Sequence, residues 1–172
     1  MTDEKATQRG RRVAIRKLKY LLLLAVSALV SCDGTVYQSF KQVSNCSWSP
    51  KDTVSFLYEG VSKPGSDGTT LNMTALVRYN ADYKYKNLIM RVETIRMADT
   101  LLLSVDTLHC QIYDDSGYRL GSTAGSLYQN VSNDVFVEAS PSDTLMLRLS
   151  HIMSDESLAG VCDVGLKLTS EK

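Results

Sequence analysis

The sequence predicts an all-β fold, an antiparallel β-sandwich of about seven or eight strands preceded by a helical signal segment. Three observations predict this fold. After residue 50, short runs of alternating apolar and polar residues are separated by turn-forming residues. Strand-like runs never alternate with helical ones, which argues against a parallel βαβ arrangement. No long amphipathic helix follows the leader, and the chain length suits a single domain.

The first 31 residues form a predicted secretory signal. An apolar run over residues 20–30 follows a basic region, as in signal peptides. The run has eleven residues, too few for a membrane-spanning helix, which needs about 20. The basic region holds Arg9, Arg11, Arg12, Arg16, Lys17 and Lys19.

The apolar run ends in a sequence that looks like a bacterial lipobox, formed by Leu29, Val30, Ser31 and Cys32. In a lipobox, the cysteine sulfur accepts a diacylglyceryl group, and small neighbours give the processing peptidase access. Triacylated Cys32 would anchor the protein stably, because one acyl chain binds membranes only marginally. Two alternatives stay open, an ordinary secretory signal with a chance cysteine and a short uncleaved anchor. We expect a cell-envelope protein held at the inner or outer membrane, with its domain outside the cytoplasm.

Charge divides unequally along the chain. Residues 1–31 carry a net charge of +5, and residues 33–172 carry a net charge of −5. The acidic part has no basic stripe for phosphate contacts, so nucleic acid is not an expected partner.

The domain boundaries follow from changes in pattern. Residues 32–50 are expected to carry the lipid and tether the domain, which then spans residues 51–172. Residues 34–49 are polar and without clear periodicity. Residues 54–58 are rich in β-formers and predict the first strand, and residues 60–68, with a proline and three glycines, predict a loop.

Period-two alternation predicts the remaining strands and their buried faces. These strands cover residues 71–79, 88–97, 101–113, 135–137, 145–149 and 161–169. Their expected core-facing residues are Leu71, Met73, Ala75, Val77, Leu88, Met90, Val92, Thr94, Leu145, Leu147, Leu149, Val164, Leu166 and Leu168. The connections are expected to be short turns at 80–82, 98–100 and 114–117, a long loop over 119–134 and one helical turn within 154–160.

Three cysteines follow Cys32, namely Cys46, Cys110 and Cys162. An odd number leaves at least one unpaired, and the compartment permits a disulfide. The pairing stays open, with buried free thiols as the alternative. Their spacing resembles no metal site, so we expect no metal and no cofactor other than the covalent lipid.

Several segments, in order, resemble the gliding-motility lipoprotein GldH family. The most specific is residues 76–88, which end a strand in Arg-x-Asn and continue as Asp-Tyr-x-Tyr-x-Asn-Leu. The others are Cys32 and Asp33 with Val36 and Tyr37, Trp48 with residues 52–56, residues 99–101, Asp114 and Gly117 with Leu120 and Gly121, and residues 158–166. The resemblance implies a non-catalytic envelope lipoprotein that supports a motility or secretion apparatus through protein–protein contacts.

Within residues 76–88, tyrosines and polar residues concentrate around the predicted turn at 80–82. Tyr and Arg are favoured at binding hot spots, and loops on a rigid scaffold often carry function. The predicted partner-binding residues are Arg78, Tyr79, Asp82, Tyr83, Tyr85 and Asn87. Two alternatives stay open. The tyrosines could pack a strand end against the sandwich, or they could form the platform of a carbohydrate-binding module.

No motif points to catalysis, and we expect the protein not to be an enzyme. His109 and His151 each sit in a strand-like run without a ligand pattern, which favours structural roles. Residues 121–125 have the glycine spacing of a nucleophile elbow, but threonine stands at the centre and no helix pattern follows. Asp114 and Asp115 lack the spacing of a calcium loop, so a hairpin turn is favoured.

An Asp-Thr-apolar triplet recurs four times. The family resemblance implies a bacterial group in which such triplets can accept O-linked glycans. The candidate sites are Thr53, Thr100, Thr107 and Thr144. The alternative is physical, because Asp favours turns while Thr and aliphatic residues favour the strand that follows.

Overall fold

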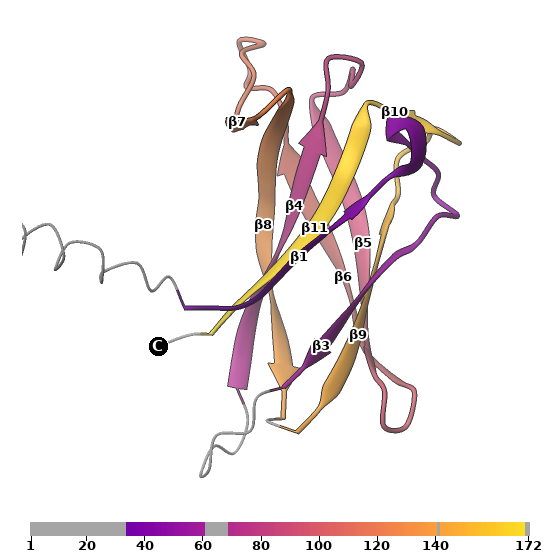
Figure 1. Ribbon diagram of the computed structural model, residues 1–172, viewed down its shortest axis with the longest axis vertical. Coiled ribbons are helices and arrows are strands. Elements are labelled where there is room, and N and C mark those ends of the chain that lie inside the picture. The colour runs from indigo at the N-terminus through magenta and orange to yellow at the C-terminus, as the bar shows by residue number, and fades with distance from the viewer. Residues whose placement is uncertain (1–33, 61–68, 141, 171–172) are drawn as a thin grey trace, which may run out of the picture. The chain divides into compact units, whose positions relative to one another are not determined.

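The computed structural model describes residues 34–60, 69–140 and 142–170, and the predicted leader and Cys32 lie outside this part of the chain. These residues form strands in which apolar and polar residues alternate. Because successive side chains point to opposite faces, the apolar face of each strand can be buried. Two antiparallel sheets pack face to face, which confirms the predicted all-β sandwich (Figure 1). In the described residues, the single helical element is a three-residue turn, η1 (Ser44–Cys46), and none is long enough to cross a bilayer.

The larger sheet has five strands, in the order β1-β11-β4-β8-β7. They are β1 (Thr35–Gln42), β11 (Val161–Ser170), β4 (Thr69–Tyr79), β8 (Leu127–Ala139) and β7 (Ser122–Ala124). The second sheet has the order β3-β9-β5-β6. Its strands are β3 (Val54–Glu59), β9 (Thr144–His151), β5 (Asn87–Arg96) and β6 (Leu101–Gln111). A small pair, β2 (Ser47–Trp48) with β10 (Leu158–Ala159), lies at one end (Figure 1).

The strand order is that of a jelly roll. The chain passes repeatedly from one sheet to the other, and within a sheet it returns beside itself only in the β5–β6 and β7–β8 hairpins. In this topology two Greek keys wrap one core between two sheets. Strands distant in sequence therefore become neighbours, as β1 and β11 do at opposite ends of the described chain.

The core lies between the two sheets and uses the faces that the alternation predicts. All fourteen predicted core-facing residues are buried. Burying one large aliphatic side chain contributes about 1.5–3 kcal/mol, so these rows account for much of the stability. The largest fully buried side chains add Trp48, Tyr79, Tyr83 and Phe56.

The structure differs from the predicted tether, because Thr35–Gln42 is β1 of the larger sheet. It pairs with β11 from Thr35 opposite Thr169 to Gln42 opposite Asp163. An edge strand has a neighbouring strand on one side only, and its other edge is exposed to water. Polar residues are therefore tolerated in β1, and the alternation of apolar and polar residues is not visible in its sequence. Tyr37 supplies the apolar contact, meeting the edge of Tyr58 at a centroid distance of 6.0 Å.

Two further connections were predicted wrongly. The expected loop over 119–134 contains β7 and most of β8, joined by a turn with Gly125 at φ 65°. The expected helical turn within 154–160 contains β10 instead, where Leu158 pairs with Trp48. Both segments are rich in residues that favour turns, and in both cases pairing with a distant strand decided the outcome.

A disulfide joins Cys46 to Cys162, and Cys110 is a buried free thiol. The sequence left this pairing open. The bond connects η1, just after β1, to the start of β11, and so closes a loop of 116 residues. Burial raises the pKa of the Cys110 thiol to about 12, which keeps it protonated and unreactive.

Candidate functional site

The sandwich has one end where the described chain enters and one far from it. The Ser170 N–H donates to the Gly34 carbonyl at 2.9 Å, so the entry point lies where β11 finishes. At the opposite end of the same sheet, Tyr79 of β4 pairs with Val161 of β11. The connections after β4, β6 and β9 gather at this second end, which we call the distal end (Figure 1).

Two of the predicted contact tyrosines are core residues. Tyr79 and Tyr83 are fully buried. The Tyr83 hydroxyl donates to the Asn87 carbonyl at 2.8 Å, and the Tyr79 hydroxyl donates to Asn130 Oδ1 at 3.2 Å. Burial raises the pKa of Tyr79 to about 12 and that of Tyr83 further, so both hydroxyls stay neutral donors. Their rings are not available to a partner, in agreement with the alternative that the tyrosines pack a strand end.

Side-chain and backbone hydrogen bonds hold the turn at 80–82. Asn80 Oδ1 accepts the Asp82 N–H at 2.9 Å, the side-chain bond of an Asx turn, and Asn80 Nδ2 donates to Asp82 Oδ2 at 3.0 Å. The Gly160 carbonyl accepts the Asn80 N–H at 2.9 Å, while the Gly160 N–H donates to the Cys46 carbonyl at 2.7 Å. Gly160 therefore links this turn to the disulfide.

Tyr85, Asp82 and Asn87 are the predicted residues that lie exposed at the distal end. The Tyr85 hydroxyl donates to Asp155 Oδ2 at 2.6 Å, and this bond raises the pKa of Tyr85. An ion pair between Lys86 and Asp115 joins the same connection to the one after β6. Side-chain contacts thus tie the three distal connections to one another.

Arg78 contacts residues of other strands in the larger sheet. Its guanidinium carbon lies 3.8 Å from the ring centroid of Phe40, and its Nε donates to Gln129 Oε1 at 2.9 Å. Asp163 stands 4.0 Å away, and both partners of this ion pair are partly exposed, so it adds little stability. Arg78 therefore braces neighbouring strands of the larger sheet.

Arg119 was not among the predicted site residues, yet it organises the connection after β6. Its guanidinium carbon lies 3.9, 5.2 and 5.5 Å from the ring centroids of Tyr128, Tyr113 and Tyr79. One of its terminal nitrogens donates to the Tyr113 hydroxyl at 2.8 Å, and the other has no partner among the described residues. Such cation–π contacts hold the loop against the core. A lone cation in the Gly- and Ser-rich run of 119–134 was the available signal.

Four large apolar side chains are exposed on the distal connections. They are Tyr118, 74% exposed, Ile152, 50% exposed, Tyr85, 38% exposed, and Leu120, 36% exposed. We call these four the distal apolar group. Exposed aromatic and aliphatic residues that are held on braced loops are typical of protein contact surfaces.

The two histidines have different surroundings. The buried His151 ring meets the Trp48 ring edge-on at 5.3 Å, and its Nε2 lies 3.0 Å from the Trp48 carbonyl, to which it donates. His109 is exposed, and its backbone N–H donates to Asn133 Oδ1 at 2.6 Å. In the ranges that the structure covers, no three His, Cys, Asp or Glu side chains form a potential metal site.

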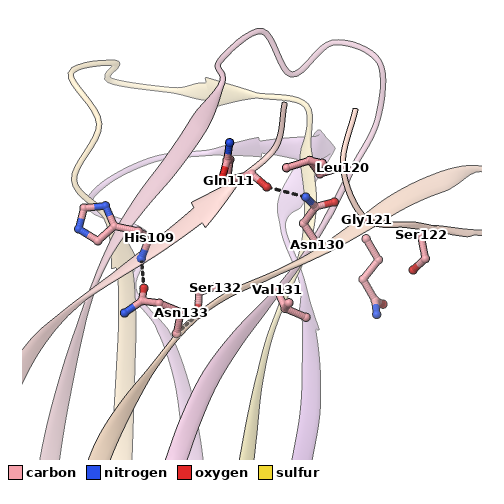
Figure 2. A pocket seen from close by; sticks show the side chains of 10 residues that line it. His109, Gln111, Leu120, Gly121, Ser122, Asn130, Val131, Ser132 and Asn133 are labelled. Carbon is pink, nitrogen blue, oxygen red and sulfur yellow. Dashed lines mark hydrogen bonds between the residues drawn. The ribbon is translucent and has the colours of Figure 1, made fainter. Parts of the chain in front are cut away.

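A hollow of about 560 Å³ lies between β6 and the β7–β8 hairpin (Figure 2). Its lining includes His109, Gln111, Gln129 and Asn130, which offer amides and one imidazole but no paired carboxylates. Thr123, at the centre of the elbow-like spacing, pairs with Tyr128 within the hairpin. The hollow therefore offers polar contacts, which include the hydroxyls of Ser122 and Ser132.

Three of the four Asp-Thr-apolar triplets lie at turns and strand starts, and the fourth, residues 106–108, lies within β6. Asp99 accepts two bonds from Arg96, at 3.1 and 2.8 Å, which lowers the pKa of Asp99. Asp143 Oδ2 accepts the Ser140 N–H at 3.0 Å. These contacts give Asp99 and Asp143 a structural role. Of the candidate acceptors, Thr53, Thr100 and Thr107 are exposed, and Thr144 is half-buried.

Residues 35–168 match the model of the GldH lipoprotein family. The chain belongs to the GldH lipoprotein family. The match spans the sandwich from the start of β1 to within two residues of the end of β11, including the distal connections and both cysteines of the disulfide. Family membership implies a membrane-anchored place in the cell envelope, without deciding between the inner and outer membranes.

Solved structures show only distant likeness to this GldH-family chain. Eiger TNF from S. frugiperda is 6% identical, with a TM-score of 0.34 over 81% of this chain and 95% of that one. Dimeric latent PorU from Porphyromonas gingivalis is 10% identical, with a TM-score of 0.30 over 83% of this chain and 14% of that one. A search of the curated proteins finds no match. We draw no function from likenesses of this size.

Burial of His151 should make the protein less stable in mild acid. Burial lowers the pKa of His151, so the unfolded chain binds this proton more readily than the folded chain. Stability should therefore fall as the pH drops below about 6.5, the ordinary histidine pKa. Urea titrations between pH 5 and 8 should show this loss, and His151→Gln, which can still donate to the Trp48 carbonyl, should reduce it. An unchanged pH profile in His151→Gln would contradict this role.

Proposed function

We propose that this chain is a lipid-anchored envelope lipoprotein whose domain binds other proteins and supports assembly or stability of a gliding-motility or secretion apparatus. The observation that carries the proposal is the distal apolar group, Tyr85, Tyr118, Leu120 and Ile152, exposed on braced connections. Family membership supports the envelope location. The proposed activity is binding rather than catalysis.

The position of the proposed lipid orients the domain. Cys32 precedes Gly34 by two residues, and two residues span at most about 7 Å. A lipid on Cys32 would therefore hold the Gly34 end of the sandwich close to the membrane. The distal apolar group, at the other end of the strands, would then face away from the lipid and toward other proteins.

Carbohydrate binding receives less support from the structure. That alternative needs exposed ring faces on the tyrosines of residues 79–85. Tyr79 and Tyr83 are buried, which leaves Tyr85 as the exposed ring of the predicted platform. The structure therefore favours protein binding over carbohydrate binding at the distal end.

Lipidation should be found on Cys32. Mass spectrometry of the mature N-terminus should detect a diacylglyceryl-modified, N-acylated Cys32, because the lipobox spacing directs the lipid to this sulfur. Cys32→Ser should leave a soluble or unprocessed species. An unmodified Cys32 behind a different mature N-terminus would reject the anchor.

Replacing exposed distal residues should remove partners without unfolding the domain. We expect Tyr118→Ser with Ile152→Ser to keep the parent melting temperature, since exposed substitutions typically change stability by less than about 0.5 kcal/mol. The same double variant should lose the envelope proteins that crosslink to the tagged parent in its native host.

The matched control is Leu57→Ser with Val36→Ser. These side chains are 47% and 43% exposed and lie on β3 and β1, away from the distal connections. The control should keep the partners. A folded distal variant with a full set of partners would reject the distal apolar group as the contact surface.

A further inference from the structure

Two strand edges face each other along one side of the sandwich. β6 is the last strand of its sheet, and β8 is covered on its outer side by β7 only over Leu127–Gln129. Beyond Gln129, β8 has no strand on that side in the described part of the chain. Exposed edges of this kind can accept an added strand, and most native proteins protect them.

Side chains close the distal half of this seam. Asn133 Oδ1 accepts the His109 N–H at 2.6 Å, and Asn130 Nδ2 donates to the Gln111 carbonyl at 2.6 Å (Figure 2). In an antiparallel strand, the backbone groups of alternate residues point to the same side. The register with β5 is regular from Gln111 to Ser104, so the N–H and C=O of Thr107 and Val105 also point away from β5. Within the described residues, no strand pairs with β6 on that side.

A cavity of about 640 Å³ lies beside this uncapped half. Thr94 and Ser104, which pair across β5 and β6, line it. Thr94 is completely buried, and the hydroxyls of both residues have no partner among the residues described. Phe136 of β8, also in the lining, is 63% exposed. The cavity thus offers buried polar groups for the side chains of an incoming segment, because such groups are normally satisfied.

The uncapped half of β6 also exposes apolar side chains. Leu102 and Val105 are each about half exposed. Free backbone groups, exposed apolar side chains and an adjoining cavity are the three elements of peptide recognition by strand addition. We propose that residues 101–107 of β6 bind an extended segment of a partner protein as an added β-strand. This inference rests on the proposed protein-binding function and supplies it with a second surface.

The charges of this side favour a basic segment. Glu138 and Asp143 line the cavity, and Asp106 of β6 has a buried carboxylate oxygen without a partner in the described chain. Arg96 also lines the cavity, but Asp99 already holds its guanidinium. A second copy of this chain would bring the same carboxylates to the edge, so like charges disfavour self-pairing. The occupant is therefore a partner segment with Lys or Arg and hydroxyl side chains facing the cavity.

The test uses the full lipoprotein in detergent and a phage-displayed library of random decapeptides. Selection should enrich basic sequences with alternating side-chain character, and their binding should weaken with added salt. Thr107→Pro removes an outward N–H without touching the β5 pairing, and should weaken binding of the selected peptides by roughly tenfold or more. Thr107→Val keeps the N–H and is the matched control, which should bind like the parent.

A second variant tests the same proposal without introducing a proline, in case Thr107→Pro disturbs folding. Glu138→Lys should weaken the same peptides, whereas Glu59→Lys, on the opposite edge strand β3, should not. Failure to enrich peptides, or equal binding by Thr107→Pro and Glu138→Lys in folded form, would overturn the proposal. A dimer that Thr107→Pro dissociates would assign the edge to a second copy and overturn the partner assignment. These measurements do not depend on the Tyr118→Ser with Ile152→Ser variant. Strand addition at β6 and protein binding by the distal apolar group can therefore be rejected independently.

Discussion

Gly160→Ala should lower the free energy of unfolding by about 2–5 kcal/mol, the sum of a backbone and a packing cost. Gly160 has φ +91°, where an L side chain is strained. A Cβ there would lie 2.3 Å from the Tyr83 backbone nitrogen and 2.7 Å from its Cα. Neither neighbour can yield easily, because Gly160 also holds Asn80 and Cys46 through backbone hydrogen bonds. Urea denaturation of the lipoprotein in detergent measures the loss.

Gly117→Ala is the matched control for this substitution. Gly117 has φ +81°, but a Cβ there would meet nothing within 4 Å. This variant should therefore show only the backbone cost of about 1–2 kcal/mol. Equal losses at the two glycines would show that close approach to Tyr83 does not constrain Gly160.

Breaking the Cys46–Cys162 disulfide should cost about 2–5 kcal/mol. The bond closes a loop of 116 residues, and an open chain of that length has far more unfolded conformations to lose. Cys46→Ser and Cys162→Ser should each show the loss, measured as the denaturation midpoint, and so should the parent protein after reduction.

The double variant provides the internal control. Since both cysteines act through one bond, Cys46→Ser with Cys162→Ser should cost about as much as either single change. Under denaturing, non-reducing conditions, one thiol of residues 34–170 should react, that of Cys110. Two additive losses, or three reactive thiols in the parent, would contradict the pairing.

The distal end shows why a motif rich in tyrosine has two roles. Tyr83 and Tyr79 anchor the connection after β4 in the core, while Tyr85 emerges from the same segment and bonds to Asp155. A double change at Tyr83 and Tyr85 would therefore mix a stability effect with a surface effect. Tyr118 and Ile152 test contact more cleanly because both are exposed.

The sequence by itself determined the strands in which apolar and polar residues alternate, because the apolar residues of such a strand form its buried face. The Leu88 and Leu145 rows face the core as predicted, because a strand with one buried face must alternate. Residues 76–88 and their companion segments also carry the resemblance to the GldH family, which the match over residues 35–168 confirms. Both inferences rest on information that is local in the chain.

Only the tertiary structure decided which distant segments meet. The sequence of β1 resembles a polar tether, because an edge strand has one edge exposed to water and needs few apolar residues. Cys46 finds Cys162 because β1 pairs with β11, which no spacing between the cysteines could show. Tyr83 is buried because Gly160, 77 positions later, lets the chain pass against its backbone. Burial in a loop depends on what covers it, and the covering segment is remote in sequence.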